Sequence, residues 1–177
     1  AREVQEALLP RDIETKMPSR LEFSYKYIPT LAVGGDFFDI ARISQNVVGV
    51  FIADVMGHGA QPALITVLIK TLLSELVCEV QTPAELLSEL NHRYNDLVHH
   101  TGIFTSAFYL TIDIDEHKVM FSNAGHPPPF LISQEKLEFE ELTEESGLAL
   151  GLYSEYDYKN YKSRLEKGDI VLLYTDG

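Results

Sequence analysis

Cysteine and long apolar runs are scarce in this sequence, and each scarcity excludes a class of protein. With a single cysteine, Cys78, the chain cannot form an internal disulfide framework, and it fits a reducing compartment. No signal peptide is recognisable and no apolar run is long enough to cross a bilayer, so we expect a cytoplasmic domain without membrane contact. Cys78 lies in an apolar stretch with helical spacing and is expected to be a structural thiol.

Basic residues are also few, with 14 Lys and Arg against 27 Asp and Glu, which gives a net charge of −13. Because nucleic-acid affinity rests on clustered basic side chains, this balance predicts a protein that does not bind nucleic acid. What the chain does have is 45% hydrophobic and 23% charged residues over 177 positions. These values are typical of one globular domain with a substantial core.

The first half of the chain carries both strand and helix patterns. Apolar residues alternate over 21–30, and the composition of 46–54 is that of a fully buried strand. Helical spacing over 62–80 and again over 83–98 predicts two helices buried in a layered core. The "TPAE" stretch places an N-cap at Thr82, where the second helix begins.

From residue 103 onward the apolar period changes to two, the period of a β-strand. Strands are expected in five segments: 103–115, 118–125, 128–133, 158–166 and 169–176. The acidic segment 135–146 is expected to be an exposed excursion. Two adjacent long helices between sets of antiparallel strands predict an α+β layered domain rather than alternating βαβ units.

Four stretches place polar or glycine residues at the end of an apolar strand: 34–39, 53–59, 123–129 and 172–177. Asp36 and Asp54 flank one strand, so a hairpin between that strand and the "GGDFFD" segment would bring the two carboxylates together. Asp176 ends another apolar strand in a similar glycine turn. Taken singly, an aspartate before a glycine is usually only a turn. Three carboxylates at strand ends suit Mg²⁺ or Mn²⁺, which prefer oxygen ligands.

The motifs "GGDFFDI", "ADVMGHG", "FSNAGHPPPFLI" and "DIVLLYTDG", in this order, resemble the SpoIIE/RsbU-type branch of the PPM (PP2C-like) serine/threonine phosphatases. The resemblance covers about residue 20 to the end. It implies a phosphatase domain over 20–177 with a four-layer αββα sandwich, whose two antiparallel sheets meet at a site for two Mn²⁺ or Mg²⁺ ions. Residues 1–12 resemble the linker helix that joins such domains to an upstream sensor domain.

The resemblance also implies roles for individual residues. Asp36, Asp54 and Asp176 match metal-binding aspartates, with Asp54 as the bridging ligand and the backbone carbonyl of Val55 beside it. Asp36 and Asp54 are therefore the expected catalytic residues, acting through a metal-activated water. Members of this family carry a further metal-binding aspartate and a last strand downstream of the "TDG" turn, so the domain is expected to be C-terminally truncated at Gly177.

Residues beside these ligands are expected to support the turns. Gly57 and Gly59 allow backbone conformations that other residues resist, and Gly35 and Gly177 adjoin the ligands. His58 lies four residues after Asp54, where a second-shell or packing role is favoured over proton donation.

Two further residues lie near the motifs. His126 is expected to be a hydrogen-bonding turn residue rather than a ligand, since hard cations favour oxygen. Asp39 is expected either to support the site or to be simply exposed. His92, His99 and His100 have no ligand spacing and are expected at the surface.

The resemblance predicts a cytoplasmic protein phosphatase acting on phosphoserine or phosphothreonine in a partner protein, with an anti-anti-sigma (STAS-type) protein as the substrate class. The linker helix raises the possibility of a homodimer. Two alternatives stay open. One is a phosphatase-like binding or dimerisation module without catalysis, and the other is a metal-dependent hydrolase of small phosphate compounds.

Overall fold

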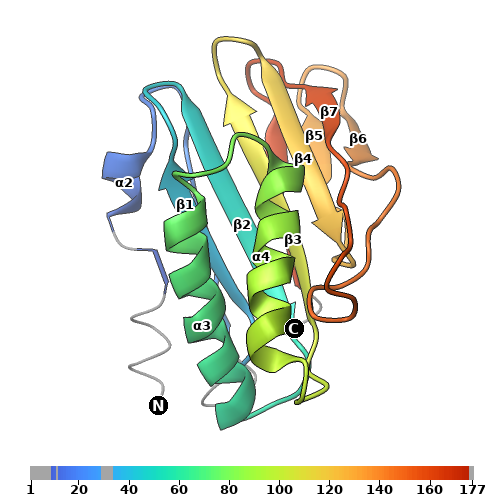
Figure 1. Ribbon diagram of the computed structural model, residues 1–177. Coiled ribbons are helices and arrows are strands. Elements are labelled where there is room, and N and C mark those ends of the chain that lie inside the picture. The colour runs from blue at the N-terminus through green and yellow to red at the C-terminus, as the bar shows by residue number, and fades with distance from the viewer. Residues whose placement is uncertain (1–8, 11, 29–33, 176–177) are drawn as a thin grey trace.

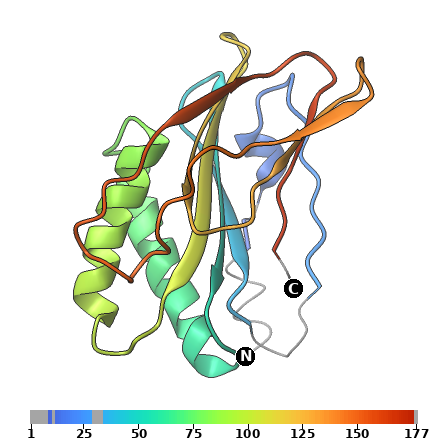
Figure 2. The same ribbon diagram turned by 90° about the vertical axis from the view of Figure 1, so that its right-hand side faces the viewer.

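The structure, a computed structural model, describes residues 9–10, 12–28 and 34–175. These residues form three layers: a pair of helices, a five-stranded sheet and a three-stranded sheet (Figures 1 and 2). The elements in chain order are α2 (Ile13–Lys16), β1 (Phe37–Arg42), β2 (Val47–Val55), α3 (Ala60–Leu76), α4 (Pro83–Val98), β3 (Thr105–Asp113), β4 (Lys118–Ala124), β5 (Phe130–Ser133), β6 (Glu138–Glu141), β7 (Tyr161–Arg164) and β8 (Ile170–Leu172).

The larger sheet has the strand order β1-β2-β3-β4-β7, and every pair in it is antiparallel. β1 and β2 form the expected hairpin, with Phe37 opposite Ala53 at one end and Arg42 opposite Val48 at the other. Six consecutive residues of β2, from Val48 to Ala53, are buried because both faces of this strand are covered. The fully apolar pattern of this strand is explained by that double burial.

The helices α3 and α4 connect β2 to β3 and lie together on one face of the larger sheet (Figure 1). The expected cap is present: the Thr82 hydroxyl accepts from the Glu85 backbone N–H, and the Glu85 carboxylate accepts from the Thr82 N–H. The first helix ends at Leu76, earlier than expected. Cys78 therefore lies in the following turn and is exposed, so the expectation of a structural thiol is wrong.

Two clusters of buried apolar side chains fill the spaces between the layers. The cluster between the helices and the larger sheet includes Phe51, Leu90 and Tyr94. The cluster between the two sheets includes Val50 and Ile52, the strand neighbours of Phe51. Because successive side chains of a strand point to opposite faces, β2 contributes alternately to the two clusters.

The smaller sheet has the order β6-β5-β8, and it packs over the face of the larger sheet that the helices leave free (Figure 2). Its strand β6 lies within the acidic segment 135–146, where an excursion without a strand was expected. All four residues of β6 are exposed, as expected for that segment, but they pair with β5 at the edge of the sheet.

The strand expected over 21–30 is not formed by the described residues 21–28, which have no ladder partner there. Instead, Leu21 and Phe23 pack against the inter-sheet cluster. An alternating pattern records only that one face is buried, whereas a strand also needs a neighbouring edge to bond with.

The described residues contain the two sheets and one helical layer of the expected αββα sandwich. The linker helix expected over 1–12 falls almost wholly outside the described residues. Among the residues described, no helix combines the length and the apolar character that a bilayer crossing requires.

Candidate metal centre

Asp36 and Asp54 lie across from each other at one end of the β1–β2 hairpin. The register that pairs Phe37 with Ala53, continued by one residue, places Asp36 opposite Asp54. The hydrogen bond from the Val55 N–H to the Gly35 carbonyl oxygen, 3.3 Å long, follows the same register beyond this pair. Directly opposite residues of an antiparallel pair have neighbouring Cβ atoms on one face, so the hairpin brings these carboxylates together.

Both carboxylates belong to the face that looks toward the smaller sheet. Asp54 follows Ile52 by two positions on β2, and Ile52 belongs to the inter-sheet cluster. Asp36 lines a cavity of about 1020 Å³ between the two sheets, together with Tyr174 and Thr175, which follow β8. Both aspartates are half-buried. The described end of the β8 segment therefore reaches the same cavity as Asp36.

The backbone around this pair depends on glycine at three positions. A Cβ added to Gly35 would lie 2.3 Å from the Val55 carbonyl oxygen, so only glycine permits this approach of the two strands. Gly57 and Gly59 have φ angles of 104° and 92°, in the region that favours glycine. Gly59 is also the N-cap residue of α3. The glycine turn thus lets β2 pass into α3 directly after Asp54.

His126 joins the two sheets at this end of the molecule. Its Nδ1 lies 2.9 Å from the Ser106 Oγ, and its Nε2 lies 3.1 Å from the Tyr174 carbonyl oxygen. Ser106 is the β3 partner of Asp54 in the larger sheet, and Tyr174 follows β8 of the smaller sheet. The side chain is only 4% exposed. His126 is thus hydrogen-bonded in the turn, as expected.

The backbone of this histidine is held by Asn123. The His126 N–H donates to the Asn123 Oδ1 at 2.8 Å, and the Asn123 Nδ2 donates to the His126 carbonyl oxygen at 2.9 Å. Gly125 within the turn has a φ of 72°. The "NAGH" stretch is therefore a closed turn in which asparagine fixes the backbone and glycine allows the bend.

Other candidate residues are not brought to this pair. Asp39 faces the helices, where its carboxylate forms an ion pair with Lys70 of α3 at 2.9 Å. Its side chain is 14% exposed, so it is neither at the site nor simply exposed. His58 is exposed in the turn before α3. The three histidines expected at the surface are exposed: His92, His99 and His100.

Asp176 and Gly177, the third expected metal ligand and its neighbour, lie outside the described residues. Within the part of the chain that the structure describes, no group of three or more His, Cys, Asp or Glu side chains has a metal-binding arrangement. The described donors are two carboxylates on one face, with the Val55 carbonyl on the same strand. This all-oxygen set fits a hard divalent cation, and a cation would offset the repulsion between like charges placed opposite each other.

Two residues near the pair were not singled out from the sequence. Ser106 stands opposite Asp54 and contacts His126, and Asn123 closes the turn that carries His126. Asn123 is the first residue of a quoted motif and could have been found by its Asn-x-Gly turn pattern. A serine within an apolar strand gives no such signal, because its partners lie far away in the sequence.

Comparisons with known proteins show the family to which the chain belongs. The sequence model described as "Stage II sporulation protein E (SpoIIE)" matches residues 44–177. The phosphoserine phosphatase RsbU of Bacillus subtilis is 33% identical over 179 residues, an alignment that covers all of this chain and 51% of RsbU. The chain thus spans about half the length of this curated relative.

Two solved structures share the fold. The SiaA-PP2C domain of Pseudomonas aeruginosa matches 95% of this chain and 65% of its own, with a TM-score of 0.79 and 23% identity. RsbX, solved in complex with magnesium, matches 77% of this chain and 63% of its own, with a TM-score of 0.59 and 20% identity. Because the family match covers more than half of the residues, this chain belongs to the SpoIIE family, whose solved relatives have PP2C-like domains.

Proposed function

We propose that this chain is the catalytic domain of a metal-dependent protein serine/threonine phosphatase. The observation that carries the proposal is the pairing of Asp36 with Asp54 across the β1–β2 hairpin, on the face between the sheets. The relative RsbU, named a phosphoserine phosphatase, supports the same activity. A phosphoprotein of the anti-anti-sigma (STAS) type is the proposed substrate class.

The proposed chemistry assigns the metal ions to the oxygen donors of this end of the sheet. Asp36, Asp54, the Val55 carbonyl and Asp176 are the proposed ligands of two Mn²⁺ or Mg²⁺ ions, and the magnesium complex of RsbX supports a divalent cation. When bound, such ions supply a water nucleophile of lowered pKa and offset charge on the phosphoryl oxygens.

In the proposed reaction, the residues of this chain hold the metal ligands in position. The ladder between β1 and β2 fixes the spacing of the two carboxylates, and the close approach at Gly35 keeps the strands in register there. A site on paired strands varies less in geometry than one on loops, which favours a reaction that depends on alignment. In this proposal the aspartates hold the metal ions in place, and the phosphoryl group forms no covalent bond with the protein.

The test is hydrolysis by the full chain with and without Mn²⁺, using a phosphorylated STAS-domain protein and p-nitrophenyl phosphate as alternative substrates. We expect turnover that requires the metal and is faster with the phosphoprotein. The Asp54→Asn variant should lose it, and Asp39→Asn is the matched control on the opposite face of the same hairpin. Metal-independent turnover, or equal loss in both variants, would refute the assignment.

One alternative is a phosphatase-like binding module without catalysis. That module predicts a folded chain with no turnover on either substrate at saturating Mn²⁺. Faster hydrolysis of p-nitrophenyl phosphate than of the phosphoprotein would instead favour a hydrolase of small phosphate compounds.

A further inference from the structure

The turn between β4 and β5 carries a buried histidine for which the proposed chemistry has no use. His126 is 4% exposed, although histidine is usually only partly buried. A hydrogen bond at each ring nitrogen, and two more at its backbone, hold it in one orientation. A residue held by hydrogen bonds at both its side chain and its backbone can fix the position of one element relative to another.

The two ring contacts reach different sheets. A carbonyl oxygen only accepts, so the Nε2 of His126 carries a hydrogen and donates to Tyr174. In the neutral ring, Nδ1 then accepts from the Ser106 hydroxyl. Ser106 is on β3 of the larger sheet, and Tyr174 follows β8 of the smaller sheet. The imidazole therefore connects the two sheets through one hydrogen bond at each ring nitrogen.

Each hydrogen-bond partner of the imidazole is close to an expected metal ligand, one in the sheet and the other in the sequence. Ser106 is the cross-strand partner of Asp54. Tyr174 precedes Asp176 by two positions in the sequence, and Thr175 between them lines the cavity that Asp36 also lines. The hydrogen bonds of His126 thus set the distance between the β8 segment and the carboxylate pair.

The segment after β8 is attached to both sheets by contacts of different kinds. Among the described residues, β8 is three residues long and pairs with β5. The Tyr174 ring stacks on Phe130 of β5 at 5.7 Å, a contact within the smaller sheet. Val171 and Leu173 pack against the apolar cluster between the sheets. The hydrogen bond from His126 to Tyr174 adds a directional contact from the turn that follows β4 of the larger sheet.

We propose that His126 is a positioning residue, which sets the β8 segment against the Asp54 strand, where the proposed function places divalent cations. This inference rests on the proposed function. In this proposal the buried imidazole does not contact metal or substrate. The imidazole acts through its hydrogen bonds with Ser106 and Tyr174. Removal of a residue that orients metal ligands in this way typically lowers metal affinity by about 10-fold or more.

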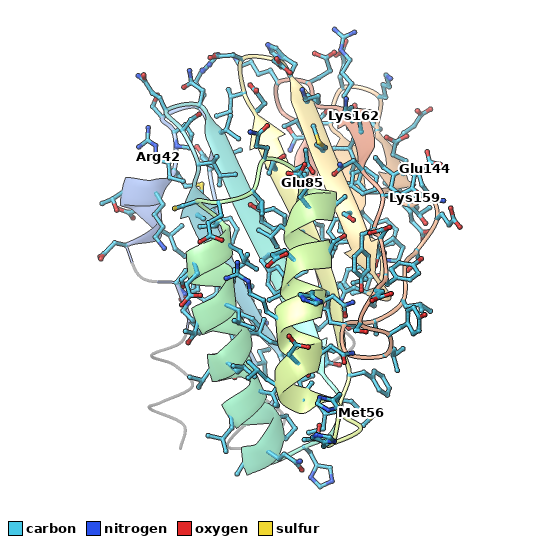
Figure 3. All side chains as sticks on the ribbon, viewed as in Figure 1. Arg42, Met56, Glu85, Glu144, Lys159 and Lys162 are labelled. Atoms are coloured by element: carbon cyan, nitrogen blue, oxygen red, sulfur yellow. The ribbon has the colours of Figure 1, made fainter. Side chains whose placement is uncertain are left out.

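Two substitutions separate the contacts. In His126→Gln the amide NH₂ reaches the position of Nε2 and keeps the donor to Tyr174. In His126→Asn the amide oxygen takes the place of Nδ1 and keeps the Ser106 contact, but the side chain is too short for Tyr174. Thr82→Ala is the stability control, because it removes a cap of α4 beside Glu85, at the end of the helix layer opposite Met56 (Figure 3).

The experiment measures two quantities on the full chain. Hydrogen–deuterium exchange of residues 170–175 is followed without metal, and Mn²⁺ affinity is measured by calorimetry. In His126→Asn we expect exchange about fivefold faster, the equivalent of one lost hydrogen bond. We also expect Mn²⁺ binding about 10-fold weaker. His126→Gln should stay within about threefold of wild type in both measurements, and Thr82→Ala should change neither.

The possible results of this experiment test the inference and the proposed function separately. If hydrogen exchange rises equally in the Gln and Asn variants, or in neither, then His126 does not connect the two sheets through Tyr174. Faster exchange in the Asn variant with unchanged Mn²⁺ affinity would overturn the positioning of ligands. If wild type binds no Mn²⁺, the proposed function and the positioning both fail, while the exchange comparison still decides whether His126 connects the sheets.

Discussion

The two faces of the five-stranded sheet are built from the same alternating strands, but they differ in how they are covered. On one face, α3 and α4 cover a large cluster of buried apolar side chains that includes Phe51, Leu90 and Tyr94. On the other, a smaller cluster and a cavity of about 1020 Å³ lie beneath the second sheet. Figure 2 shows the helices against one side of the larger sheet and the β8-β5-β6 sheet against the other.

The polar groups of the two faces differ in the same way. On the helix side, Asp39 is neutralised by Lys70, and burial raises the pKa of the Tyr109 hydroxyl, which keeps it neutral. On the inter-sheet side, Asp36 lines the cavity and, by the register of the hairpin, stands opposite Asp54. Asp36, directly before β1, and Asp39, within β1, thus have different environments although they are three positions apart. The helix-facing side provides stability, and the inter-sheet side carries the proposed chemistry.

The strongest test of this division is Asp54→Asn. Removing a charged group that the proposed transition state depends on should lower kcat by about 10³-fold, or ~4 kcal/mol. The variant should also lose the rise in Tm that Mn²⁺ gives to wild type. Steady-state kinetics and thermal unfolding with and without Mn²⁺ measure both effects. A variant with full activity would show that Asp54 is not at the reacting centre.

Leu90→Ala tests the helix-facing side. Leu90 is fully buried in the cluster beneath the helices, so its truncation should lower the free energy of unfolding by about 3 kcal/mol. Mn²⁺ affinity, measured well below the new Tm, should stay within about twofold of wild type if the two faces are independent. Denaturant unfolding and calorimetry supply the two values. A large loss of affinity would mean that the helices help to shape the metal centre.

Asp39→Asn tests the carboxylate of β1 that faces the helices, for comparison with Asp36 directly before the strand. It breaks a half-buried ion pair and should cost about 1.5 kcal/mol of stability, because hydrogen bonds to charged groups exceed neutral ones. Activity should change by less than about twofold, since the side chain faces the helices. The double variant Asp39→Asn with Lys70→Met is the control, and it should recover part of the stability. Loss of metal binding in Asp39→Asn would break the comparison.

The smallest expected effect has the opposite sign. The Ser122 hydroxyl is buried on β4 without a hydrogen-bond partner among the described residues. Ser122→Ala should therefore raise the free energy of unfolding, by up to about 1 kcal/mol, because no desolvated hydroxyl remains. Thermal unfolding measures the shift, with Ser106→Ala as the comparison, since Ser106 does have a partner in His126. A destabilised Ser122→Ala would show that this hydroxyl makes a bond.

Local patterns predicted much of the fold because they reflect local physics. The capping box at Thr82 formed as expected, since its partners lie within one helical turn. The hairpin that joins Asp36 to Asp54 was also expected, because a short connection between two apolar strands favours antiparallel pairing. The strand expected over 21–30 was wrong for its described part, since alternation does not supply a neighbouring edge. Cys78 was misplaced because the helix boundary fell earlier than its apolar spacing suggested.

The sequence by itself determined most of the strands, the helix cap at Thr82 and the glycine turn after Asp54, because each depends on residues close together in the chain. Only the tertiary structure decided that Asp39 belongs to the helix side, that Ser106 stands opposite Asp54, and that His126 spans the two sheets. These are contacts between residues distant in the sequence. The packing of layers selects them, and a linear pattern carries no record of which faces will meet.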